Sequence, residues 1–167
     1  MINLIQDAFP EIQNCLSVFN EKHIYVFENN ELKKGIFVAN TQPKHLHIEN
    51  KTNSNFHFIQ NDDCVMHNVK GGQCDYVIFN SKDFHFVDVK VAKDNIANHS
   101  KKAYLQIENT FKYYSNKIDF PENYLLNGLV CFPSKRRIIK PSQSTKRKEF
   151  KVRYKIDLKV GNYILLE

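Results

Sequence analysis

The sequence lacks the patterns that mark several large classes of protein. No apolar run approaches the roughly 20 residues that a membrane-spanning helix needs. The N-terminal segment carries Asp7 and Glu11 and lacks the basic-then-apolar pattern of an export signal. Neither a glycine-rich nucleotide-binding loop nor a G-x-S-x-G nucleophile elbow is present, so the sequence carries no sign of ATP use or acyl transfer. These absences favour a cytoplasmic protein with no membrane partner.

The cysteines also lack a metal-binding or redox spacing, because no two of them form a Cys-x-x-Cys pair. The four residues are Cys15, Cys64, Cys74 and Cys131. Scattered cysteines in a cytoplasmic protein are expected to be reduced and largely buried. The sequence therefore predicts free thiols here, rather than a disulfide or a zinc site.

Arginine is missing from the first 134 residues, which hold 13 lysines against 15 acidic residues. Residues 135–167 hold 11 basic residues against 3 acidic ones, so the whole net charge of +6 originates at this end. Such a one-sided distribution suits contact with a polyanion. At 167 residues, the chain is predicted to form one compact domain, 1–167, with a basic C-terminal element at 135–167.

Two strand-like runs, residues 72–80 and 84–91, flank a short turn and predict a β-hairpin. Because side chains alternate across a strand, Asp88 and Lys90 share one face of the second strand. In an antiparallel hairpin, Asp75 on the first strand lies near the same end. Two carboxylates and an ammonium group are therefore expected to converge. A divalent cation held by such a pair, with a lysine beside it, suits phosphodiester hydrolysis.

A helix is predicted after the hairpin, from residue 101 to about residue 117, with Ser100 as its N-cap. One stripe of this helix has apolar or small residues at spacings of three and four: Ala103, Ile107, Thr110, Phe111 and Tyr114. Gln106 stands beside that stripe, so it is expected to face the sheet near the carboxylate pair.

These motifs resemble the PD-(D/E)XK, or restriction-endonuclease-like, nuclease superfamily. Asp75 matches the first acid, residues 88–90 match the acid-any-Lys triplet, and residues 103–110 match an Ala-x-x-Gln-x-x-x-Thr helix pattern. Cys74 stands where the superfamily often has proline. The resemblance covers residues 62–132. It implies catalytic roles for Asp75, Asp88, Lys90 and Gln106, and a Mg²⁺ ion, replaceable by Mn²⁺, held by the two aspartates.

Two upstream acids are further metal-ligand candidates by the same resemblance. Asp62 belongs to an Asp-Asp-Cys segment like one that some small superfamily members carry before the first acid. Glu11 borders the apolar stripe of the first predicted helix, where the superfamily often places a metal-binding glutamate. The alternatives are an acidic turn for Asp62 and a solvated side chain for Glu11.

The remaining segments complete an expected α/β (α+β) fold, in which helices flank a mixed central sheet with extra N-terminal hairpins. An amphipathic helix is predicted over residues 3–19, with Pro10 able to divide it. Hairpins are predicted at 23–28 with 35–39, at 46–49 with 56–60, and at 155–158 with 163–166. Residues 125–132 read as a buried strand beside the catalytic hairpin, parallel to a neighbour.

The basic C-terminal element is predicted to contain a short helix, capped by Ser142 or Ser144 and ending near Tyr154. The residues expected to contact nucleic-acid phosphates are Arg136, Arg137, Lys146 and Arg147. A solvated run of charges is the alternative.

Histidine offers no comparable site. His45 and His47 share a strand face, but ordinary strand surface is the favoured interpretation over zinc. His85 lies on the opposite face of its strand from Asp88, so it is not expected to act as a general base.

The sequence thus predicts a Mg²⁺-dependent nuclease acting on nucleic acid, with DNA as the favoured substrate, in genome defence, restriction or repair. A non-catalytic nucleic-acid-binding or partner-binding module that keeps the fold is the main alternative, and an RNase or toxin-like effector is a third. Cleavage of both strands by one small active site would favour a homodimer.

Overall fold

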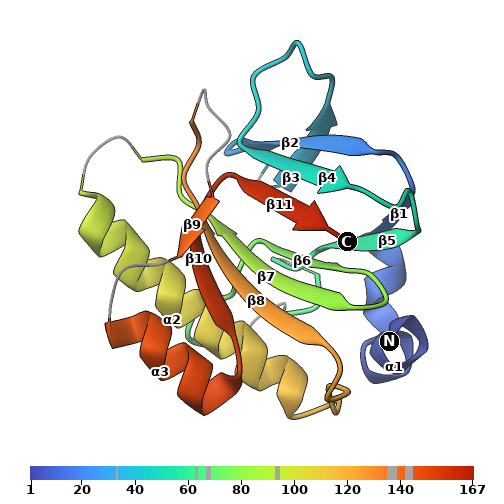
Figure 1. Ribbon diagram of the computed structural model, residues 1–167, viewed down its shortest axis with the longest axis vertical. Coiled ribbons are helices and arrows are strands. Elements are labelled where there is room, and N and C mark those ends of the chain that lie inside the picture. Colours follow the sequence, from blue (N-terminus) through green and yellow to red (C-terminus); the bar gives the residue numbers. More distant parts are fainter. Residues whose placement is uncertain (33, 63, 67–68, 93–94, 135–138, 142–144) are drawn as a thin grey trace.

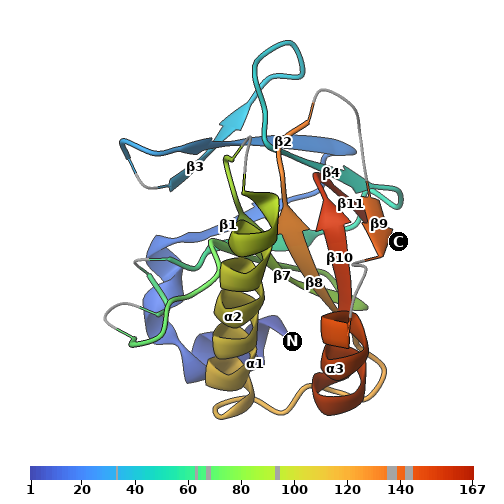
Figure 2. The same cartoon turned by 90° about the vertical axis from the view of Figure 1, so that its left-hand side faces the viewer.

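The computed structural model describes residues 1–32, 34–62, 64–66, 69–92, 95–134, 139–141 and 145–167. These residues form a mixed α+β fold with two mixed β-sheets and three α-helices (Figure 1). Helices α2 and α3 lie side by side on one face of the larger sheet, and the smaller sheet lies toward its other face (Figure 2). The predicted class, a mixed sheet flanked by helices, is confirmed at this level.

The larger sheet has seven strands in the order β1-β5-β6-β7-β8-β10-β9. Their bounds are Leu16–Phe19, Phe56–Gln60, Tyr76–Phe79, Asp83–Val89, Leu125–Cys131, Asp157–Gly161 and Ile139–Pro141 in that order. The predicted hairpin is confirmed as β6 and β7, which pair antiparallel at the centre of the sheet. The strand predicted after the helix is β8, which pairs parallel to β7. Both β6 and β7 are buried along their whole length.

The smaller sheet has four strands in the order β11-β4-β2-β3. Their bounds are Tyr163–Leu166, Leu46–Asn50, His23–Asn29 and Lys34–Val38. The first predicted hairpin is confirmed as β2 with β3. The face of the larger sheet that meets this layer is apolar, with Tyr76, Ile78 and Val87 packed against Val26 and Ile48. The two layers bury a shared core between them.

Two predicted hairpins are wrong, because their strands separate into different sheets. β4 pairs with β2 and β11, whereas β5 pairs with β1 and β6. β10 pairs with β8 and β9, whereas β11 pairs with β4. At the second junction, the carbonyl of Gly161 accepts the N–H of Phe132 in the larger sheet, and the next carbonyl, of Asn162, accepts the N–H of His47 in the smaller sheet. The chain therefore changes layer within one residue.

The predicted helix over residues 3–19 is wrong beyond residue 14. Helix α1, Ile2–Ala8, ends before Pro10, which occupies the start of a separate 3₁₀ helix, η1, Pro10–Asn14. Proline cannot donate a main-chain hydrogen bond within a helix, so the segment divides at this point. Leu16–Phe19 then forms β1, which pairs with β5 instead of continuing the helix.

Helix α2 spans Ile96–Ser115, five residues earlier at its start than predicted. Asn95 precedes it with a φ of 49°, a left-handed conformation that asparagine tolerates, so Ser100 lies inside the helix and is not its N-cap. The predicted stripe is confirmed, since Ala103, Ile107 and Thr110 are buried against the sheet. Helix α3, Thr145–Tyr154, ends where predicted, while Ser142 and Ser144 lie outside the described residues.

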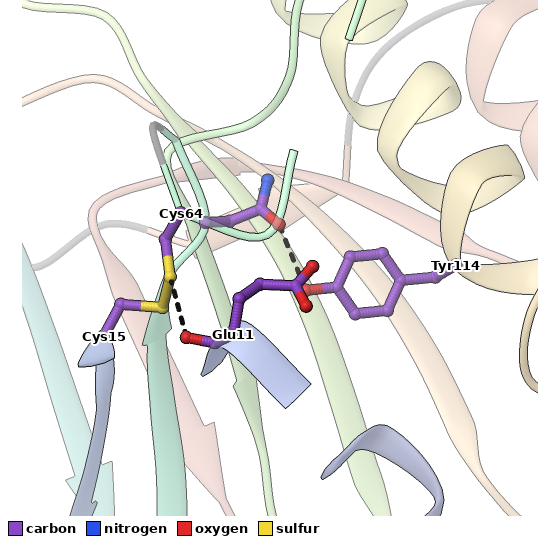
Figure 3. Close-up of a disulfide and its surroundings, with 5 residues drawn as sticks. Glu11, Cys15, Cys64 and Tyr114 are labelled. Atoms are coloured by element: carbon purple, nitrogen blue, oxygen red, sulfur yellow. Dashed lines mark hydrogen bonds between the residues drawn. A yellow bond between two sulfur atoms is a disulfide. The ribbon is translucent and has the colours of Figure 1, made fainter. Parts of the chain in front are cut away.

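The prediction of four reduced cysteines is wrong. Cys15 and Cys64 form a disulfide, with their Cα atoms 6.4 Å apart, that joins the start of β1 to the turn after β5 (Figure 3). Their 49-residue separation in sequence hides this proximity, which arises because β1 and β5 are neighbouring strands. Cys74 and Cys131 are free and buried, as expected. The cysteine pattern therefore no longer supports a reducing compartment.

Candidate active site

The hairpin brings the two predicted aspartates and the lysine together. Tyr76 on β6 pairs with Val87 on β7, so the next step of the same antiparallel register places Asp75 opposite Asp88. The N–H of Val89 donates a hydrogen bond to Oδ2 of Asp75 at 2.5 Å. Nζ of Lys90 lies 2.6 Å from Oδ2 of Asp88. The convergence expected from strand alternation is thus present.

Asp88 is the most buried member of this group, with 0% of the residue exposed. Burial raises its pKa to about 6, although the ammonium group of Lys90 opposes that shift. The pKa of Asp75 is also raised well above its usual value, first by burial and then by the negative charge of Asp88. Like charges directly opposite on neighbouring strands destabilise a sheet. The carboxylate pair is therefore an electrostatic cost to the fold.

A hard divalent cation would offset that cost, and the chemistry of the pair suits one. Apart from the Lys90 contact, neither carboxylate oxygen of Asp88 accepts a hydrogen bond from a described residue, although both oxygens are buried. Within the described ranges, no group of three or more His, Cys, Asp or Glu side chains is placed to hold a metal. Two carboxylates are nevertheless a fitting donor set for Mg²⁺, which commonly keeps several waters and binds substrate phosphates for its remaining positions.

The two upstream acids end in different places. The main-chain N–H of Asp62 donates to the carbonyl of Asp75 at 3.4 Å, and the negative charge of Asp62 contributes to the raised pKa of Asp88. The side chain of Asp62 accepts a hydrogen bond from Nε2 of Gln73. Glu11 instead lies on η1 beside the disulfide, with its side chain directed toward Tyr114 (Figure 3). The charge of Asp62 thus acts on Asp88, but among the described residues its carboxylate does not join the pair as a third metal ligand, and Glu11 lies elsewhere.

Helix α2 holds the segment that leads into Asp75. Nε2 of Gln106 donates to the carbonyl of Gln73 at 2.8 Å, and Oε1 of Gln106 is buried without a hydrogen-bond partner. Oγ1 of Thr110 accepts the N–H of Cys74 at 2.9 Å and donates to the carbonyl of Gln106. Gln106 thus faces the segment that leads into Asp75, and its Oε1 has no hydrogen-bond partner among the described residues.

Two charged residues near the carboxylate pair were not predicted from the sequence. The positive charge of Lys102 on α2 lowers the pKa of Asp88, against the dominant effect of burial. Lys102 lies four residues before Gln106, so the helical spacing could have revealed it. Glu28 on β2 accepts a hydrogen bond from the hydroxyl of Tyr76, and its negative charge helps to raise the pKa of Asp75. No local signal pointed to Glu28, because it comes from the other sheet.

The predicted phosphate contacts on α3 have partners inside the molecule. Nζ of Lys146 lies 2.7 Å from Glu149, and the guanidinium group of Arg147 lies 3.0 Å from Asp157. Arg136 and Arg137 lie outside the described residues. The two described candidates are thus engaged in ion pairs within the chain.

His85 lies away from the carboxylate pair, as predicted. It is buried on the face of β7 opposite Asp88, and it lines a cavity of about 500 Å³ that also borders Asn127 and Ile164. Burial lowers the pKa of His85 to about 3, so its imidazole is neutral at physiological pH.

Comparisons with protein-family models, with curated proteins and with solved structures gave no match for this chain. In the described part of the chain, no helix is both long and apolar enough to span a membrane. The site must therefore be interpreted from its own chemistry.

Proposed function

We propose that this chain is a metal-dependent nuclease that hydrolyses phosphodiester bonds, with DNA as its substrate. The observation that carries the proposal is the buried carboxylate of Asp88, which faces Asp75 across the hairpin. Among the described residues, Lys90 is its one cationic contact, at 2.6 Å. Carboxylate pairs that raise each other's pKa are concentrated at functional sites. Strand propensity also disfavours aspartate in apolar β-runs, so a functional reason for both residues is expected.

The order of elements supports a restriction-endonuclease-like core. Strands β6 and β7 form the hairpin, α2 crosses one face of the sheet, and β8 returns parallel to β7. This succession, together with Asp75, the Asp88–Lys90 triplet and Gln106, is the basis for proposing a nuclease of PD-(D/E)XK type. A role in genome defence, restriction or repair would suit such an enzyme.

Each residue has a defined task in the proposed mechanism. Asp75 and Asp88 would hold Mg²⁺, or Mn²⁺ in its place, and the bound ion would supply Lewis-acid polarisation and an activated water. Lys90 stabilises the negative charge that develops on the phosphoryl oxygens. Oε1 of Gln106, which has no partner, is available to accept a hydrogen bond from a water or from the substrate.

Cleavage assays with matched variants test this proposal. Purified protein is incubated with Mg²⁺ or Mn²⁺ and with single-stranded DNA, double-stranded DNA and RNA. We expect Asp88→Asn to abolish cleavage, and Lys90→Met to lower kcat by roughly 100- to 1000-fold, as when one preorganised charge-stabilising group is lost. Asp83→Asn is the matched control, because Asp83 is a buried carboxylate at the other end of β7.

Metal binding gives a second readout that does not depend on the substrate chosen. Mn²⁺ titrated against the wild-type chain should show a site by electron paramagnetic resonance that Asp88→Asn lacks and Asp83→Asn keeps. A wild-type chain that neither binds Mn²⁺ nor cleaves any of the three substrates would contradict the proposal and favour a non-catalytic binding module.

A further inference from the structure

One side of α3 is committed to the fold. Phe150 packs against Tyr104 of α2, and Tyr154 packs against Phe111 of the same helix. The hydroxyl of Tyr154 donates to Oε1 of Glu108 at 2.6 Å. These contacts determine which side of α3 faces inward.

The basic residues of α3 and of the position directly after it fall into two groups. Three of them are neutralised locally: Lys146 and Arg153 contact Glu149, and Arg147 contacts Asp157. Three others, Lys148, Lys151 and Lys155, are exposed. We call these three the lysine row. The structure gives none of the three an ion pair or a hydrogen bond to another described residue.

The lysine row follows one side of the helix. A spacing of three residues places Lys148 and Lys151 on one helical face. Lys155 directly follows the last helical residue, with a φ of 60°, and extends the row beyond the end of α3. At 3.6 residues per turn, Lys148 lies on the side of α3 opposite Phe150, whereas Lys151, three residues before Tyr154, borders the side that packs against α2. No acidic residue interrupts the row, since Glu149 lies on another side with its two cationic partners.

We propose that the lysine row binds the phosphate backbone of duplex DNA. From Lys148 to Tyr154, its last residue, the helix rises about 9 Å at 1.5 Å per residue, and Lys155 follows directly. A DNA strand presents one phosphate per roughly 3.4 Å of axis, so the row matches about three consecutive phosphates. Residues 135–167 carry 11 basic and 3 acidic residues, which adds charge complementarity to this fit. The inference rests on the proposed function for the identity of its partner.

The row also lies on the appropriate side of the molecule for a substrate of the carboxylate pair. α3 and α2 lie next to each other on one face of the larger sheet (Figure 2). Asp88 alternates with Phe84 and Phe86 along β7, both of which pack against α2 on that face. Lys102 on α2 directs positive charge toward Asp88. A backbone bound along α3 can therefore approach the site past α2.

The salt dependence of DNA binding tests the row directly. The full wild-type chain and the triple variant K148Q/K151Q/K155Q are titrated against a labelled 20-base-pair duplex, with EDTA present to remove divalent cations. Glutamine preserves helix propensity. Losing three phosphate contacts should reduce the magnitude of the negative slope of log K against log salt by about 2.7 on this duplex.

A second triple variant, K22Q/K34Q/K82Q, is the matched control. These lysines are also exposed, lie before β2, on β3 and in the β6–β7 turn, and change the net charge equally. We expect this control to leave the slope unchanged. Equal losses in the two variants, or an unchanged slope in the row variant, would overturn the inference. Circular dichroism and thermal unfolding verify that both variants are folded.

The two proposals fail separately, because binding in EDTA needs no catalysis. If the salt slope depends on the lysine row but no metal-dependent cleavage is seen, the DNA-binding surface is supported and the nuclease proposal is contradicted. If the wild type cleaves DNA but the salt slope is the same in the row variant, the nuclease proposal is supported and DNA binding by the lysine row is contradicted.

Discussion

Asp88 carries a carboxyl group in an environment that disfavours its charged form. Its carboxyl group is completely buried, faces another aspartate and has one cationic contact. Burial raises its pKa to about 6, compared with roughly 4 for an unfolded aspartate. The folded chain therefore binds this proton more tightly than the unfolded chain does. Consequently, the stability of the metal-free protein falls as pH rises from about 4 to about 6, and stays lower above that range.

Replacing Asp88 with asparagine should therefore stabilise the metal-free protein at neutral pH. The neutral amide removes both the ionisation cost and the repulsion of Asp75, while Lys90 retains some solvent access. We expect a gain of roughly 1–3 kcal/mol at pH 7.5, from a pKa shift of about two, that disappears near pH 4. Thermal unfolding in EDTA across this pH range measures it.

The exposed residue Asp119 provides the control for this measurement. Asp119→Asn should leave the Tm at pH 7.5 unchanged. A lower Tm for Asp88→Asn at pH 7.5 would show that the ion pair with Lys90 outweighs the cost of burial. Adding Mg²⁺ should raise the Tm of the wild type and not that of Asp88→Asn, because only the wild type keeps both carboxylates.

At the scale of single elements, the sequence revealed what depends on local pattern. The hairpin of β6 and β7, the buried stripe of α2 and the strand β8 all carry their signal within a few neighbouring residues. The same strand alternation predicted that Asp75, Asp88 and Lys90 would converge. Alternation indicates which face of a strand is buried, but not which strand lies beside it.

The wrong strand pairings, the unexpected disulfide and the position of Glu28 depend on contacts between segments distant in sequence. β4 and β5 are consecutive, as are β10 and β11, yet each pair divides between two sheets. Glu28 reaches the site region from the smaller sheet through the hydroxyl of Tyr76, and Cys15 meets Cys64 because β1 pairs with β5. Which strands pair, and which distant side chains meet, is determined by the packing of the whole core.

Thr110 connects α2 to the segment that carries Asp75, just before β6, and its replacement should affect both. Its hydroxyl accepts the N–H of Cys74 and donates to the carbonyl of Gln106. Thr110→Val keeps the shape but leaves the buried N–H of Cys74 unsatisfied, at a cost of about 1–3 kcal/mol. We expect a lower Tm and faster hydrogen exchange of the Cys74 amide.

Ser115 is the control on the same helix, because its hydroxyl makes an exposed bond to the carbonyl of Lys112. Ser115→Ala should leave Tm and the Cys74 amide unchanged. If Thr110→Val leaves the exchange of that amide unaltered, the hydroxyl does not hold the segment entering Asp75.

For the whole molecule, the arrangement of layers determines how the site is supported. The carboxylate pair lies on a central hairpin with α2 on one side and the smaller sheet on the other, and Glu28 and Lys102 extend toward it from those two layers. The turn after β5 carries Asp62 and is covalently joined to β1 by the Cys15–Cys64 disulfide. The disulfide therefore links β1, at the edge of the larger sheet, to the turn whose main chain is hydrogen-bonded to Asp75.

Breaking this disulfide should destabilise the molecule as a whole. A cross-link between residues 49 positions apart restricts the unfolded chain and is worth about 4 kcal/mol in the chain-entropy estimate. We expect dithiothreitol to lower the free energy of unfolding of the wild type by up to that amount, measured by urea denaturation. The double variant C15S/C64S should match the reduced wild type and should not respond to dithiothreitol, because the buried Cys74 and Cys131 are already free. An oxidised wild type with two titratable thiols supports the pairing, whereas four thiols titrating in denaturant without reductant would show that the bond does not form.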